Sequence, residues 1–228
     1  MNEHIAGKVV VVTGAAGRLG QRVLHRFAQE GARLAAVVHS AEQARRFQLP
    51  EQAEGAVFYA DLTHEAQVVA CFDQIQDRFG QVNVLIHAVG AWAERPLREL
   101  TLNEWHALLG ANLTSTFLCF REAARLMQGQ GGRLIAFAAM QGVDRGRARQ
   151  AAYSAAKGGL VRLVEALGAE LGSQGITVHA IAPSVIHYGE EKPTTGIAAD
   201  QLVELCLWLC SPHAAALNGT TLRAYGSL

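Results

Sequence analysis

The sequence predicts an α/β fold, a doubly wound parallel sheet with helices on both faces. Three observations predict it. Short apolar runs of strand length alternate with segments of helical periodicity along the whole chain. The first run, VVVV at residues 9–12, is continuously apolar, as expected for a strand buried on both faces. The connections are short, and no repeat or linker divides residues 1–228, so we expect one domain.

Each expected strand or helix follows from a local residue pattern. Residues 8–14 form an apolar run that ends in glycine, and residues 18–31 form an amphipathic helix that stops at Gly31. The same apolar and β-branched pattern predicts further strands at 33–40, 56–62, 82–90, 132–139, 176–184 and 219–225. Helical periodicity predicts helices at 41–49, 63–80, 102–127, around Tyr153, and at 198–211. Residues 187–196 are rich in breakers and are expected to form a loop that serves as a short substrate lid.

Composition excludes several classes of protein. Twenty basic residues balance twenty acidic ones at a pI of about 7.1, so nothing indicates binding of nucleic acid. The valine run near the start is too short for a signal peptide, and no apolar run approaches the roughly 20 residues that span a bilayer. The four cysteines have apolar neighbours and no C-x-x-C spacing, which favours buried free thiols over a metal or redox pair. We expect a cytoplasmic protein with no metal and no membrane partner.

A glycine-rich turn follows the first predicted strand. Gly14, Gly17 and Gly20 are three residues apart and open the first amphipathic helix. Glycines at such a turn let a phosphate approach the backbone and the positive end of the helix. In an open parallel sheet, ligands bind at the carboxyl ends of the strands. The turn therefore predicts a dinucleotide site in a Rossmann-type sheet, with a tight turn that binds no ligand as the alternative.

The end of the second strand predicts which dinucleotide is bound. A carboxylate there would accept the ribose hydroxyls of NAD and repel a 2′-phosphate. The strand instead ends in Val38, His39 and Ser40, while Arg18 lies in the glycine turn, where it could reach a 2′-phosphate. We expect NADP(H) in preference to NAD(H). The alternative is that Arg18 and His39 are solvated surface residues.

Tyr153 and Lys157 are four residues apart in a predicted helix, so their side chains share one face. An ammonium beside a phenol favours the phenolate and is expected to lower the pKa of Tyr153 from about 10. Such a tyrosine could transfer protons near neutral pH. The alternative is that the two residues are merely neighbours on a helix.

The glycine turn, ANL around Asn112 and YSAAK around Tyr153 occur in an order that resembles the short-chain dehydrogenase/reductase family over nearly the whole chain. The resemblance implies hydride transfer between a nicotinamide and a carbonyl, imine or alcohol of a small molecule. It also implies a homodimer or homotetramer. Tyr153 would be the acid/base, Lys157 would lower its pKa and bind the ribose, and Asn112 would hold a water of the proton relay. The implied cofactor contacts are Gly14, Gly17, Arg18, Leu19, Gly20, His39, Ser40, Asp61, Leu62, Ala88, Gly90, Tyr153, Lys157, Pro183 and Ile186.

The sequence also departs from the family pattern. The family serine that hydrogen-bonds the substrate oxygen is replaced by Ala138 or Ala139. His87 replaces an asparagine after the fourth strand, and Tyr188 stands where the family has a threonine. Only about ten residues separate IAPSVI from the last helix, so the resemblance implies an open, shallow site.

Three questions stay open at this point. Dihydropteridine reductases resemble the chain in lacking the serine, in the short lid and in a tryptophan where Trp92 stands, although Trp92 could instead be an apolar plug. A catalytically inactive dinucleotide-binding or sensor protein is the other alternative. Arg145, Arg147 and Arg149 precede Tyr153, where they could face an anionic or electron-rich substrate or form a solvated loop.

Overall fold

The computed structural model describes residues 4–51, 53–189 and 194–227, and it contains a seven-stranded sheet in the order β3-β2-β1-β4-β5-β6-β9. Every neighbouring pair in this sheet is parallel. This confirms the predicted fold class. The strands are β1 (Val9–Thr13), β2 (Arg33–Val38), β3 (Gly55–Tyr59), β4 (Val84–His87), β5 (Gly132–Phe137), β6 (Ile176–Pro183) and β9 (Thr220–Ala224).

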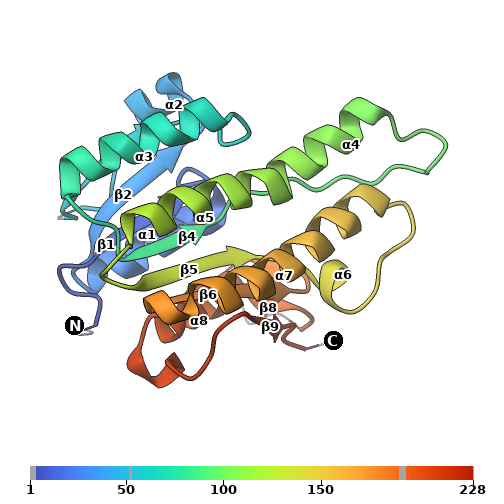
Figure 1. The fold of residues 1–228 in the computed structure, drawn as a ribbon. Helices are drawn as coiled ribbons and strands as arrows, with labels where there is room; N and C mark the ends of the chain where they lie inside the picture. Colours follow the sequence, from blue (N-terminus) through green and yellow to red (C-terminus); the bar gives the residue numbers. More distant parts are fainter. Residues whose placement is uncertain (1–3, 52, 190–193, 228) are drawn as a thin grey trace.

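The helices lie on both faces of the sheet (Figure 1). Those of regular α geometry are α1 (Arg18–Gln29), α2 (Ala41–Arg46), α3 (Glu65–Phe79), α4 (Leu102–Leu109), α5 (Ser115–Leu126), α6 (Met140–Val143), α7 (Ala151–Leu171) and α8 (Ala199–Leu209). Figure 1 shows α3, α5 and α7 side by side across one face, with α4 and α6 at the edge where the strands end.

The side chains of β1 show how one strand supplies two cores. Val9 and Val11 pack into the cluster that contains residues of α3, α5 and α7. Val10 and Val12 pack into the cluster that contains residues of α1 and α8. All four valines have no exposed surface, because successive side chains of a strand point to opposite faces and both faces are covered.

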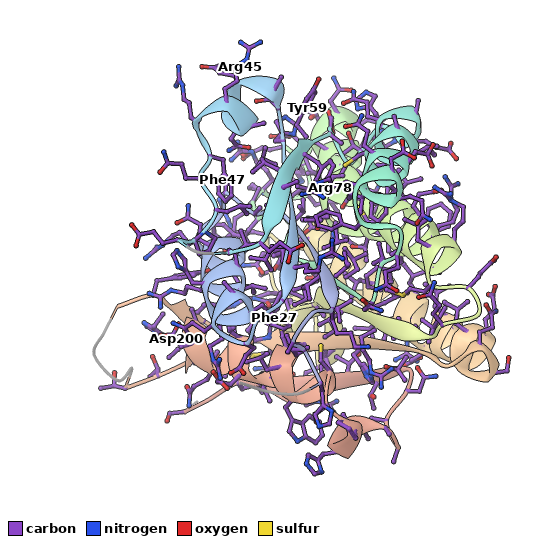
Figure 2. The ribbon with its side chains drawn as sticks, turned by 90° about the vertical axis from the view of Figure 1, so that its left-hand side faces the viewer. Phe27, Arg45, Phe47, Tyr59, Arg78 and Asp200 are labelled. Carbon is purple, nitrogen blue, oxygen red and sulfur yellow. The ribbon has the colours of Figure 1, made fainter. Side chains whose placement is uncertain are left out.

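Ion pairs join the two helices on the α1 face. Arg22 contacts Asp200 at 2.6 Å and Arg26 contacts Glu204 at 2.5 Å. Beneath them, Phe27 of α1 is fully buried. Figure 2 labels Phe27 and Asp200 and shows that they come from α1 and from the start of α8. These contacts fix the position of α1, whose first turn borders the candidate site.

The topology creates a crevice beside β1. This strand pairs with β2 on one side and with β4 on the other, so the chain winds in opposite directions from that point. Crevices at such switch points, outside the carboxyl ends of the strands, are where ligands bind in open α/β sheets. The glycine turn after β1 and residues 88–90 after β4 lie at this edge.

The structure differs from the expected helix at 102–127. A π-helical turn, Gly110–Thr114, separates α4 from α5 and contains Asn112. The apolar periodicity of the segment continues through this turn, so the sequence pattern alone did not indicate it. Single π turns inside helices are frequent at functional sites.

The expected loop and lid near 187–196 is described in part. Ile186–His187 forms β7 and pairs in parallel with β8, Ile197–Ala198. Residues 190–193 of this prediction lie outside the described residues. The short pairing brings the two ends of the segment together at the edge of the sheet.

Candidate active site

Two cavities lie at the carboxyl edge of the sheet. One, here named the tyrosine cavity, has a volume of about 440 Å³ and is lined by residues that include Tyr153 and Lys157. The other, the aspartate cavity, has a volume of about 350 Å³ and is lined by residues that include Asp61 and His39. Both are lined by Gly17, Ala88, Val89 and Gly90. The two cavities therefore form one groove along the strand ends.

The glycine turn is built for close backbone approach. Gly14 has a φ of +69°, and a Cβ there would lie 2.7 Å from the carbonyl oxygen of Ala88. A Cβ on Gly20 would lie 2.2 Å from the carbonyl oxygen of Gly14. Gly17 precedes α1 and has no side chain to cap it, so the first N–H groups of the helix are free for an anion. This arrangement fits the diphosphate of a dinucleotide.

The aspartate cavity contains several of the expected cofactor contacts. His39, Asp61 and Leu62 line it, with Gly14 at its inner end. Burial raises the pKa of Asp61, but hydrogen bonds from Thr63 outweigh this and hold the pKa below its usual value. Asp61 is therefore a charged acceptor at neutral pH. Ser40 is not among the lining residues, and its hydroxyl instead accepts a hydrogen bond from the Gln43 N–H and caps α2.

The tyrosine cavity brings together the expected reactive pair. The Nζ atom of Lys157 lies 5.9 Å from the centre of the Tyr153 ring and donates a 2.6 Å hydrogen bond to the Phe137 carbonyl oxygen. Burial lowers the pKa of Lys157 to about 8 and raises the pKa of Tyr153 to about 12. The expected lowering of the tyrosine pKa is absent because desolvation of the phenolate is the dominant effect.

Asn112 lies beside this pair but is occupied by the backbone. Its Nδ2 donates to the carbonyl oxygens of Ala91 and Leu108, at 2.8 and 2.9 Å, and its Oδ1 accepts from the Ala91 N–H at 3.3 Å. A Cβ on Gly90 would lie 2.9 Å from Asn112 Oδ1 and 3.5 Å from Lys157 Nζ. Asn112 therefore ties the π-helical turn to the segment after β4, and Gly90 lets that segment approach Lys157.

The remaining expected contacts divide between the two cavities. Leu19, Pro183 and Ile186 line the tyrosine cavity. Gly20 lines neither cavity and acts through its packing against Gly14. Arg18 lines the tyrosine cavity, not the aspartate cavity, and its guanidinium lies 4.0 Å from the centre of the Tyr188 ring.

The hydroxyl groups of the tyrosine cavity can be assigned one by one. Ala138 and Ala139, where the family resemblance implies a serine, are buried in its wall. Ser184 also lines the cavity, but its hydroxyl donates a 2.6 Å hydrogen bond to the Tyr225 carbonyl oxygen. The other hydroxyl groups of the lining belong to Tyr153 and Tyr188.

Sequence reasoning missed a polar pair in the wall of this cavity. The Nε2 of Gln150 donates a 2.7 Å hydrogen bond to a carboxylate oxygen of Glu94, and Oε1 of Gln150 is buried without a partner among the described residues. Glu94 lies in the loop after β4, and Gln150 precedes α7. Because they are 56 residues apart, no local pattern could have paired them. Trp92, in the same loop, is 59% exposed and lines the cavity, so it is not a buried plug.

Buried histidines and cysteines complete the chemistry of the chain. His87, at the end of β4, lies within hydrogen-bond distance of Thr13 and Ser115. All four cysteines are free and buried, as expected.

Within the described residues, no group of three or more His, Cys, Asp or Glu side chains could hold a metal ion. No helix in the same part of the chain is both long and apolar enough to cross a membrane.

A parallel sheet with a glycine turn at its switch point, and a tyrosine and lysine in the adjoining cavity, are the features expected of a dinucleotide-binding oxidoreductase. Comparison with known proteins agrees. A sequence model of the short chain dehydrogenases matches residues 8–194. This chain belongs to the short-chain dehydrogenase/reductase family.

Individual relatives extend over nearly the whole chain. D-threitol dehydrogenase from Mycolicibacterium smegmatis is 32% identical over an alignment that covers 96% of this chain and 92% of that enzyme. The 3-oxoacyl-(acyl-carrier-protein) reductase of Vibrio cholerae is 28% identical, and the alignment covers 99% of this chain and 98% of the reductase. The crystal structure of levodione reductase superposes with a TM-score of 0.87 at 26% identity and covers 97% of each chain.

Proposed function

We propose that this protein is a cytoplasmic NADP(H)-dependent oxidoreductase that transfers hydride between the nicotinamide and a carbonyl or imine carbon of a small molecule. The observation that supports this best is the shared groove. The tyrosine cavity contains Tyr153, Lys157, Pro183 and Ile186, and it continues into the cavity that contains Asp61. The nicotinamide half of the cofactor fits the first cavity and the adenosine half fits the second. The bound cofactor supplies the hydride.

Tyr153 is the proton donor of the proposed reaction. A phenol whose pKa is about 12 keeps its proton at neutral pH, which is the state needed to protonate a reduced carbonyl oxygen. Lys157, with a pKa of about 8, is mostly cationic at neutral pH and can donate to a ribose hydroxyl. Its charge also favours the phenolate that remains after proton transfer. Asn112 is a positioning residue, because its side chain fixes the loop at Ala91.

The preference for NADP(H) rests on the lack of a carboxylate at residues 38–40, at the end of β2. His39 lies in the aspartate cavity where a carboxylate would select NAD, and Ser40 is occupied in capping α2. Arg18 is exposed, and its stacking on Tyr188 is worth about 0.5–1 kcal/mol. A charge-assisted hydrogen bond to a 2′-phosphate is worth about 1.5–3 kcal/mol. The phosphate would therefore draw Arg18 away from the ring, and Arg18→Ala should weaken binding of NADPH more than binding of NADH.

The proposed function is tested with Tyr153→Phe, which removes one hydroxyl and keeps the ring. General acid catalysis contributes about 10²–10⁴-fold, so kcat for reduction should fall by at least about a hundredfold. The dissociation constant of NADPH, measured by fluorescence titration, should stay within a few-fold. The substrate panel should contain simple ketones, hydroxyketones and quinonoid compounds. The proposal fails if Tyr153→Phe keeps full activity.

Ala139→Ser is the matched gain-of-function variant. This variant places a hydroxyl at the position of the missing serine. Its kcat for the reduction of simple ketones should be equal to that of the wild type or higher. If the wild type binds NADPH but reduces nothing in the panel, the alternative of an inactive dinucleotide-binding protein is favoured.

Trp92 supports one second candidate, a dihydropteridine reductase-like activity. Its exposed indole lines the tyrosine cavity and offers a flat surface for stacking of a pterin ring. A quinonoid ring carries its own charge delocalisation and depends less on a serine hydroxyl. Quinonoid dihydropterin in the panel tests this candidate, and Trp92→Ala should raise its KM while leaving the KM of small ketones unchanged.

A further inference from the structure

A third cavity adjoins the tyrosine cavity on the side of the loop before α7. It has a volume of about 520 Å³ and is named here the arginine cavity, because Arg145 and Arg147 line it. Gln141, Arg147, Ser184 and Val185 line both cavities. The two cavities are therefore neighbours, and a group of a ligand bound beside Tyr153 would lie close to the arginine cavity.

The lining of the two cavities is strongly basic. Among the described residues, the lining contains one acid, Glu94, and four basic residues: Arg18, Arg145, Arg147 and Lys157. The chain as a whole carries equal numbers of basic and acidic residues, so the excess is local. Glu94 accepts a hydrogen bond from the neutral amide of Gln150 and keeps its charge, so the four cations exceed the acid by three. A cavity with one sign of charge attracts ligands of the opposite sign.

Arg147 is the cation that carries this inference. In the described part of the chain, no hydrogen bond or ion pair engages its guanidinium. The nearest acid of its loop, Asp144, is instead paired with Arg223 at 2.8 Å, with Arg145 contributing to the positive field on that carboxylate. Arg147 is therefore an exposed cation without a paired acid among the described residues, and it lines both cavities.

The loop that carries Arg147 is anchored on both sides. The Arg147 N–H donates to the hydroxyl of Ser154 on α7 at 3.4 Å, and its carbonyl oxygen accepts from the Gln150 N–H at 3.1 Å. The Arg95 N–H donates a 2.7 Å bond to the carbonyl oxygen of Arg149, which has a φ of +65°. The backbone beneath the arginines is therefore fixed, and only the side chain has to be ordered when a ligand binds.

We propose that the arginine cavity is a subsite for an oxyanion carried by the substrate, so that the substrate class is an oxo acid with its carboxylate several bonds from the reacting carbonyl. This deepens the proposed function and rests on it for the placement of the carbonyl beside Tyr153. Arg147 holds the carboxylate, because a guanidinium binds two carboxylate oxygens at once. Arg145 adds charge at the outer end of the cavity.

The test compares each oxo acid with its neutral methyl ester. The probes are 4-oxopentanoate, 5-oxohexanoate and their methyl esters, with NADPH as cofactor. For the wild type, kcat/KM of at least one acid should exceed that of its ester by about tenfold or more. Arg147→Ala should abolish this preference by lowering kcat/KM for the acid to that of its ester, because the contact that holds and orients the acid is lost. Arg147→Lys should keep part of it, because the charge remains and the planar fork is lost.

Arg149→Ala is the matched control. It removes the same charge from the same loop and keeps a residue with a Cβ at the positive φ, and Arg149 lines none of the three cavities. It should leave the preference for the acid intact. An equal loss in Arg147→Ala and Arg149→Ala would mean that only the general field of the loop matters, and would overturn the assignment to Arg147.

A binding measurement separates this inference from the proposed function. Titration calorimetry gives the affinity of the full chain for each acid and ester without turnover. If nothing is reduced but the acid binds more tightly than its ester, and Arg147→Ala removes that difference, the subsite stands and the proposed activity falls. If acid and ester are equal in both kcat/KM and affinity, or if the wild type binds no acid, the subsite is wrong.

Discussion

The buried His87 should make the stability of the protein depend on pH in a way that can be calculated from the structure. Its Nε2 lies 3.2 Å from the Ser115 hydroxyl, which donates its own proton to the Ala111 carbonyl oxygen, so Nε2 carries the hydrogen. Its Nδ1 then accepts from the Thr13 hydroxyl at 2.8 Å. Burial and the positive charge of Lys157 lower the pKa of His87 from 6.5 to about 3. The ring is therefore neutral in the folded protein.

The direction of the effect follows from which state binds the proton first. In the unfolded chain His87 titrates near 6.5, so acid stabilises the unfolded state before it protonates the folded one. The stability due to the neutral ring is fully present above 6.5 and is lost as the pH falls toward 3. Between pH 7 and pH 5 the contribution of His87 to the free energy of unfolding falls by roughly 2 kcal/mol. The fall begins near the unfolded pKa of 6.5, about 1.5 pH units above pH 5, and amounts to about 1.36 kcal/mol per unit. His179, whose pKa burial and Arg133 lower to about 4, adds a similar loss.

The assay is urea unfolding followed by tryptophan fluorescence at pH 7 and at pH 5. The free energy of unfolding of the wild type should fall by about 4 kcal/mol between the two, a large share of the roughly 5–15 kcal/mol typical of a domain. In His87→Asn the fall should be only about 2 kcal/mol, whatever the absolute stability of the variant. His213→Asn, at an exposed position, should behave as the wild type does. An equal fall in His87→Asn and the wild type would refute the neutral, desolvated ring.

Two further predictions concern Lys157 and assembly. Because burial lowers the pKa of Lys157 to about 8, its ammonium loses the proton above that pH, and fluorescence titration should show NADPH binding weakening by roughly fivefold between pH 7 and pH 10. Lys157→Met should bind weakly at both values, and a wild-type affinity that does not change with pH would contradict this role. The protein should be a homodimer or homotetramer, as α7 in this family implies, and sedimentation at micromolar concentration that shows a monomer would oppose this expectation.

The strands and the glycine turn could be predicted because their causes are local. A run such as VVVV has one favourable environment, a strand covered on both faces, and Gly14 is required where a side chain would strike the Ala88 carbonyl. The π-helical turn around Asn112 could not be predicted in the same way. Its geometry is fixed by hydrogen bonds to Ala91, which lies 21 residues earlier in the chain.

The proximity of Tyr153 and Lys157 could be predicted from the sequence, but the electrostatics of the pair could not. Spacing placed Tyr153 and Lys157 on one face of a helix, and the structure places both in one cavity. The sequence suggested that the lysine would lower the tyrosine pKa, whereas burial raises it to about 12. Burial depends on every element that packs around the ring. No spacing rule along one helix contains that information.

If the proposed oxyanion subsite is right, it offers a physical reason why alanines can stand where the family resemblance implies a serine. With Ala138 and Ala139 in the wall and the Ser184 hydroxyl donating to the Tyr225 carbonyl oxygen, a reacting oxygen beside Tyr153 would have no serine hydroxyl in the cavity lining to orient it. Orientation can also come from a distant part of the substrate, because binding energy gained there can hold the reacting atoms in place. A carboxylate on Arg147 would fix the far end of an oxo acid, so that a single donor suffices at the carbonyl. Ala139→Ser should then raise kcat/KM for neutral ketones more than for oxo acids. In the double variant, compared with Arg147→Ala alone, Ala139→Ser should raise kcat/KM equally for the two kinds of substrate.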